Sequence, residues 1–117
     1  MVLAQNIYKE NHEELLSLCN LVRELTDTKQ YEQCRVAIAS AMEKYPNAPE
    51  PHNLYGVLFE KIGDHVSAMK HFRAAWALDP TYIPARHNMN LFGAFNIEGK
   101  CAYDESDCAP IRDRSNK

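Results

Sequence analysis

The spacing of hydrophobic and polar positions along the chain predicts an all-α fold. Apolar residues recur every three or four positions, as expected for helices with one buried face, and no run alternates strictly with β-branched enrichment. The first apolar stripe follows Asn11, which the sequence suggests as an N-cap with Glu14 as its reciprocal partner. Five helices are predicted: one opening at Asn11 and reaching at least Leu25, then 31–44, 51–62, 65–78 and 84–96.

Proline and glycine separate these predicted helices. Pro46 and Pro80 lack an amide hydrogen and restrict the preceding residue, so a helix is expected to stop before each of them. Gly63 suits the position after a helix end where φ becomes positive, and Asp64 suits the following N-cap. The loops between helices are therefore short.

A spacing of 34 residues relates the two central parts of the chain. Similar residue types recur at this interval, which is the mark of stacked helix pairs. The matching positions are Cys34 and Ala68, Ile38 and Phe72, Ala41 and Ala75, and Pro46 and Pro80. The small residues of this set, with Gly56, are expected where two helices approach to about 8–10 Å.

This pattern resembles the tetratricopeptide repeat family, in the order of small, aromatic and proline positions Gly56, Phe59, Ala68, Phe72, Ala75 and Pro80. His52 and Tyr55 depart from the residues usual in that family. The resemblance implies an α-solenoid of antiparallel helix pairs that forms a right-handed superhelix with a C-terminal capping helix. The expected units are an N-terminal segment 1–14, a degenerate repeat 15–48, a repeat 49–82, the capping helix 83–97 and a polar tail 98–117.

Composition and charge narrow the functional classes. Thirteen Lys and Arg against sixteen Asp and Glu give a net charge of −3, without the basic excess that nucleic acid requires. No uncharged stretch approaches the roughly 20 apolar residues of a membrane span. Residues 1–10 do not read as a secretory signal, so we expect a cytoplasmic protein with free thiols.

Residues that carry chemistry are dispersed. Cys101 and Cys108 are separated by six residues, unlike the closely spaced pairs of zinc sites, and the five histidines are scattered. No glycine-rich loop or nucleophile elbow is present. The acidic residues Asp104, Glu105 and Asp107 are expected to solubilise the tail. We therefore expect no metal, no cofactor and no catalysis.

The resemblance implies a binding groove lined by the first helix of each pair. Within it, Asn53 and Asn88 are expected to hold the main chain of an extended peptide, and Arg23 to meet a carboxylate. Glu60 and uncharged groups replace the basic set of domains that bind chaperone C-termini, which disfavours that ligand. The expected groove residues are Cys19, Asn20, Arg23, Asn53, Val57, Glu60, His87, Asn88 and Leu91.

The predicted capping helix has an unusually wide apolar arc, which includes Leu91, Ala94 and Phe95. Three explanations fit this arc. It packs against the third and fourth helices, pairs with a second copy in a homodimer, or accepts the C-terminal tail. In the last case the contacts would come from Ile97, Tyr103 and Ile111.

These observations favour a non-catalytic adaptor that binds a peptide or helix of a partner protein in the groove. The alternative is a self-association module that uses the apolar face of the capping helix. A regulatory piece acting beside a separate enzyme is a third possibility. The sequence contains nothing that identifies the partner.

Overall fold

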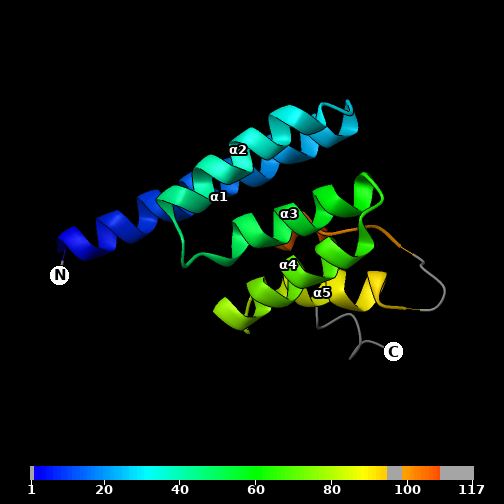
Figure 1. The fold of residues 1–117 in the computed structure, drawn as a ribbon. Coiled ribbons are helices and arrows are strands. Elements are labelled where there is room, and N and C mark those ends of the chain that lie inside the picture. Colours follow the sequence, from blue (N-terminus) through cyan, green and yellow to red (C-terminus); the bar gives the residue numbers. More distant parts are fainter. Residues whose placement is uncertain (1, 95–98, 109–117) are drawn as a thin grey trace.

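The computed structural model of the protein describes residues 2–94 and 99–108, and all its regular structure is helical (Figure 1). Within these residues there is no β-strand, so the predicted all-α class is confirmed. The elements are α1 (Val2–Asp27), α2 (Tyr31–Lys44), α3 (Pro49–Lys61), α4 (His65–Leu78), α5 (Ile83–Phe92) and the short 3₁₀ helix η1 (Glu105–Asp107).

The helix boundaries agree with the sequence in the middle of the chain and differ at both ends. The predicted bounds of α2 and α4 are confirmed. The prediction that the first helix opens at Asn11 is wrong: α1 starts at Val2, because no proline or glycine interrupts residues 2–27. The last helix ends at Phe92 and is followed by Gly93, short of the predicted end at Asn96. Residues 95–98 lie outside the described part.

The turn between α3 and α4 is built as the sequence predicts. Gly63 has a φ of 90°, a conformation that costs other residues free energy and glycine little. The Asp64 carboxylate accepts a hydrogen bond from the backbone N–H of Ser67 at 3.1 Å, which makes it the N-cap of α4. This turn therefore sets the antiparallel arrangement of α3 and α4.

Each helix packs against the next one along the chain. In addition, α3 contacts both α1 and α5. Figure 1 shows α1 and α2 as one antiparallel pair beside α3, α4 and α5. The first helix of each predicted pair thus contributes to a shared surface. No helix in the described residues is long and apolar enough to cross a membrane.

Gly56 on α3 lies directly against the ring of Phe72 on α4. A Cβ atom placed on Gly56 would lie 2.3 Å from the Phe72 ring, which no real contact allows. Phe72 is fully buried and stacks in parallel on Phe92 of α5, with ring centroids 5.8 Å apart. The prediction that Gly56 is small to let helices approach is confirmed.

Candidate functional site

The surface formed by α1, α3 and α5 carries a segment of the chain's own C-terminal part. Residues 99–108 run along it, and Figure 1 shows them in orange behind α3. Ala102, Tyr103 and Asp104 are buried, with 0%, 7% and 6% of their surface exposed. These residues belong to the predicted polar tail, so this part of the tail is packed against the helices. We refer to residues 100–107 as the docked segment.

Two buried asparagines hold the main chain of the docked segment at Ala102. The Asn53 side chain on α3 donates to the Ala102 carbonyl at 3.0 Å, and the Asn88 side chain on α5 donates to the same oxygen at 2.8 Å. The Ala102 N–H in turn donates to Oδ1 of Asn88 at 2.7 Å. Both backbone groups of Ala102 are therefore satisfied by side chains alone.

Tyr103 fills the next position and reaches α1. Its hydroxyl lies 2.6 Å from the Thr26 hydroxyl, which itself donates to the Arg23 carbonyl at 3.0 Å. Because Thr26 has only one hydroxyl proton, Tyr103 is the donor in this pair. The Arg23 guanidinium lies 5.3 Å from the centre of the Tyr103 ring, within cation–π range.

Arg23 also binds the two aspartates of the docked segment. Its Nη2 lies 2.8 Å from Asp107 and 3.2 Å from Asp104, while Nη1 donates to Asn20 at 2.6 Å. Desolvation lowers the pKa of Arg23, but the hydrogen bonds to Asp107 and Asp104 outweigh it and raise the pKa overall. Asn20 thus orients a guanidinium that meets two carboxylates.

The same aspartates organise the backbone of the segment. Asp107 accepts hydrogen bonds from the N–H groups of Tyr103 and Asp104, and the Asp104 carboxylate caps η1 through the Ser106 N–H. Burial would raise the pKa of Asp107, but the hydrogen bonds from Arg23 and from these N–H groups lower it. The prediction that these aspartates merely solubilise a tail is therefore wrong.

The other predicted groove residues divide into three groups. His87 contacts the segment through Nε2, 2.8 Å from the Lys100 carbonyl. Cys19 and Val57 are buried in the same apolar cluster as Tyr103 and have almost no exposed surface. Glu60 instead pairs with His65 on α4 at 2.6 Å.

The apolar arc of α5 is only partly covered. Leu91 is half-buried, and its Cδ1 approaches the position that a Cβ of Gly99 would take, at 3.6 Å. Ala94 is exposed, and Phe95 lies outside the described residues, as do Ile97 and Ile111. The polar contacts of α5 with the docked segment come from Asn88 and His87, while the Tyr103 side chain reaches Thr26 and Arg23 on α1.

Sequence reasoning missed Thr26 and the docked segment itself. One local signal of an ordered segment is present. Asp104 and Asp107 have the spacing of a capping box, and they form this motif at the start of η1. Nothing local marks Thr26, because its partner Tyr103 is 77 positions away.

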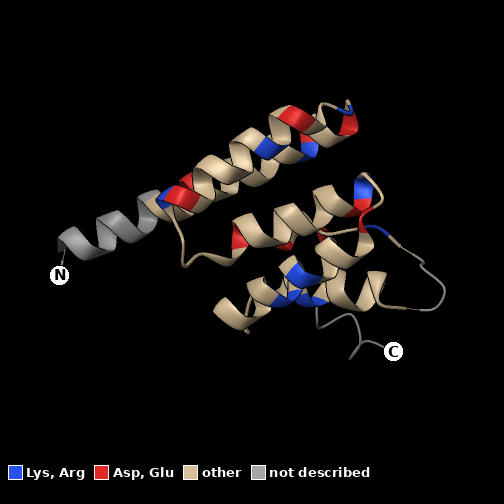
Figure 2. Cartoon of the chain, viewed as in Figure 1, with Lys and Arg blue, Asp and Glu red and all other residues tan. Residues whose placement is uncertain are grey.

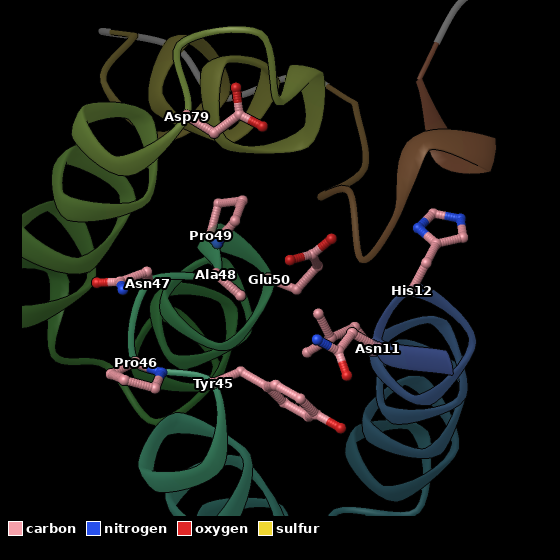
Figure 3. Close-up of a pocket in the computed structure, with 10 residues that line it drawn as sticks. Asn11, His12, Tyr45, Pro46, Asn47, Ala48, Pro49, Glu50 and Asp79 are labelled. Carbon is pink, nitrogen blue, oxygen red and sulfur yellow. The ribbon is translucent and has the colours of Figure 1, made fainter. Parts of the chain in front are cut away.

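A separate cavity of about 360 Å³ opens between the start of α3, α1 and the end of α4. Figure 3 shows the Glu50 carboxylate extending into the space between α1, which carries Asn11 and His12, and Asp79 at the end of α4. Oε1 of Glu50 is buried and has no hydrogen-bond partner within residues 2–94 and 99–108, and burial raises the pKa of this carboxyl. This cavity lies outside the predicted groove.

Potential metal ligands and thiols occur throughout the described residues. No group of three or more His, Cys, Asp or Glu side chains among them is placed to hold a metal ion. Burial raises the pKa of the Cys19 thiol to about 12, and burial with nearby carboxylates raises that of Cys108 to about 11.

Figure 2 shows basic and acidic residues interspersed along α1 and α2.

Comparison with known proteins finds no match among family models, curated proteins or solved structures. What the described residues define is an all-helical protein whose α1, α3 and α5 together hold the docked segment. Four predicted groove residues, Arg23, Asn53, His87 and Asn88, make polar contacts to that segment, as does Thr26, which the sequence pattern does not single out.

Proposed function

We propose that this protein is a non-catalytic scaffold that binds an extended peptide of a partner protein on the face of α1, α3 and α5. In this proposal the helices form a tetratricopeptide-like solenoid with a right-handed superhelix, two helix pairs and α5 as the capping helix. The concave face is the peptide groove.

One observation carries the proposal. Asn53 and Asn88 bind both backbone groups of Ala102, so they recognise main chain, which every peptide has. Both amides are fully buried, and they are held by the helices, so little ordering is needed when a peptide binds. A surface of this kind suits an extended ligand better than a compact substrate.

The resemblance in sequence supports the proposal independently. The 34-residue spacing relates α2 to α4, and the contacts of α1 with α3 and of α3 with α5 agree with stacked pairs. Self-association through Leu91, Ala94 and Phe95 stays a hypothesis. The large exposed apolar side chains that the structure describes lie on α1, α2 and α4 and in the turn after α3, and none belongs to α5.

Selection of random 12-residue peptides on phage tests the proposal. The full chain serves as one bait, and the full-chain variant Tyr103→Ala, with a weakened docked segment, serves as the other. We expect peptides that bind at least one bait with micromolar affinity and lose at least tenfold on Arg23→Gln or Asn88→Leu.

The matched control is Asn90→Leu, because Asn90 is exposed on the same helix as Asn88. Its peptide affinities should equal those of the parent bait. Circular dichroism checks that each variant is folded. If neither bait enriches peptides, or if the groove substitutions leave affinity unchanged, the proposed function is wrong.

A further inference from the structure

The docked segment contacts the groove in the way a bound peptide would. Its main chain is held by Asn53 and Asn88, its aromatic side chain reaches Thr26, and its two carboxylates meet Arg23. All of these contacts join residues far apart in the chain. The segment can therefore be read as a ligand supplied by the protein itself.

We propose that the docked segment is an internal competitor for the groove, and that the partner peptide which displaces it has the same chemistry. That peptide carries a small residue, then tyrosine, then two aspartates three positions apart. The inference rests on the proposed function, since it names the ligand class and the regulation of the same groove.

The small residue is required at the position of Ala102. Ala102 has no exposed surface, and its N–H and carbonyl are both bound to side chains from α3 and α5. A larger side chain there would need space among buried groups that are already paired. The groove therefore selects alanine or a residue of similar size.

The groove selects tyrosine at the position of Tyr103 because its hydroxyl makes a hydrogen bond to Thr26 among buried apolar side chains. Tyr103 is 7% exposed and packs with Cys19, Val22 and Leu54 in the main apolar cluster. The Thr26 hydroxyl donates to the Arg23 carbonyl, so it can only accept at its other side. A tyrosine hydroxyl donates there, whereas phenylalanine would leave the buried acceptor without a partner.

The two aspartates are specified by Arg23. Both carboxylates approach the same guanidinium nitrogen, Nη2. Both also stabilise η1, because Asp104 is its N-cap and Asp107 accepts the reciprocal hydrogen bond of the capping box. A charged donor paired with carboxylates in a partly buried site favours acidic peptides. Glu105 between them is exposed, so this position tolerates other residues, whereas the Ser106 hydroxyl donates to the Asp104 carboxylate.

The segment is held in a way that allows release. In the part of the chain that the structure describes, the backbone of α1–α5 makes no hydrogen bond to it, and side chains of α1, α3 and α5 supply its polar contacts. Such regions open at lower free energy than the helical core. The segment follows α5 closely in the chain, which gives it a high effective concentration, so a partner peptide binds the intact protein with reduced apparent affinity.

A synthetic peptide with the sequence of residues 99–108, its two cysteines replaced by serine and a fluorophore at one end, is the probe. Fluorescence anisotropy measures its Kd on the full chain and on full-chain Tyr103→Ala. We expect at least tenfold tighter binding to Tyr103→Ala, in which the groove residues are unchanged. Replacing both peptide aspartates by asparagine should weaken binding at least tenfold.

Glu105→Ala is the matched control, because Glu105 is exposed in the same segment and should leave the Kd at the wild-type value. Asp107→Asn is a milder second variant, for which we expect at least threefold tighter peptide binding. It keeps the test valid if Tyr103→Ala does not fold. Adding Arg23→Gln to either variant should reverse the gain.

Four results would overturn this inference, three in peptide binding and one in oligomeric state. The peptide binds wild type and both segment variants equally, it binds none of them, or peptides selected from the random library bind both baits equally and lack the Tyr-Asp-x-x-Asp chemistry. In the last case the proposed function stands. A wild-type dimer that Tyr103→Ala converts to monomer would instead assign the segment to exchange between two copies.

Discussion

The side-chain amide of Asn88 on α5 donates a hydrogen bond to Oδ1 of Asn53 on α3 at 2.8 Å. The same Asn88 amide donates to Ala102, so both of its N–H groups are used. Two neighbouring helices and the docked segment are thereby joined by one buried network. A network in which every member is satisfied stabilises a single arrangement, and a partial loss is costly.

Asn88→Leu should destabilise the protein by about 2 kcal/mol, because it leaves the buried N–H of Ala102 without an acceptor. The docked segment should lose most of its protection from hydrogen exchange. Urea unfolding measures the first effect and amide exchange of residues 100–107 the second. Asn90→Leu, on the exposed side of α5, is expected to change neither.

Gly56→Ala should lower the free energy of unfolding by about 1–2 kcal/mol. The new methyl group would lie against the Phe72 ring, and this overpacking outweighs the better helix propensity of alanine. Thermal or urea unfolding measures the change. In a Phe72→Leu background the same substitution should cost less, and an equal cost in both backgrounds would contradict this explanation.

Glu50→Gln should stabilise the protein at pH 7 by about 0.5–1 kcal/mol, the size of a modest single substitution. Burial raises the pKa of Glu50 above its ordinary value of 4.5, so ionisation costs free energy only in the folded state. The wild type therefore loses stability as pH rises from 4.5 through the folded-state pKa.

Unfolding curves at several pH values provide the test of Glu50. The difference between Glu50→Gln and wild type should be largest near neutral pH and should vanish below pH 4.5, where the carboxyl is protonated in both states. His12 favours the ionised carboxyl, while Asp79 and Glu105 oppose it. A difference that does not change with pH would contradict the assigned cause.

His71→Phe should make stability less dependent on pH. His52 and His71 stack with Nδ1 atoms 3.1 Å apart, and burial lowers the pKa of both, with the charge of His52 adding to the effect on His71. The unfolded chain therefore binds more protons below pH 6.5, so wild-type stability falls as pH decreases through that value. The wild-type melting temperature should fall more than that of the variant between pH 7.5 and 5.5, and parallel curves would contradict this prediction.

The helices could be predicted from the sequence because their causes are local. Hydrophobic spacing, Pro46 and Pro80, and the Gly63–Asp64 turn act within a few residues, and the predicted bounds of α2 and α4 are confirmed. The sequence does not predict the start of α1 correctly, because a residue suited to an N-cap allows a helix to begin there but does not prevent the helix from beginning earlier. Asn11 is followed by a helical pattern, but it is also preceded by residues that continue the helix.

The candidate site was predictable on one side only. The resemblance to the repeat family implies that Arg23, Asn53, His87 and Asn88 lie on one face, and in the structure these four residues contact one segment. The occupant was not predictable. The residues of the docked segment that make these contacts include Ala102, Tyr103 and Asp107. They lie in a stretch without hydrophobic periodicity, so the sequence pattern does not predict which helix each of them contacts.

The sequence by itself therefore determined the helical class and the need for a small residue at Gly56, and it singled out four polar side chains that contact the docked segment. The tertiary structure alone decided what those side chains bind. Arg23 and Asp107 are 84 positions apart, and a contact over that distance depends on how all the intervening helices pack. Hydrogen-bond complementarity between distant residues leaves no mark in local spacing, so the docked segment appears only once α1, α3 and α5 lie side by side.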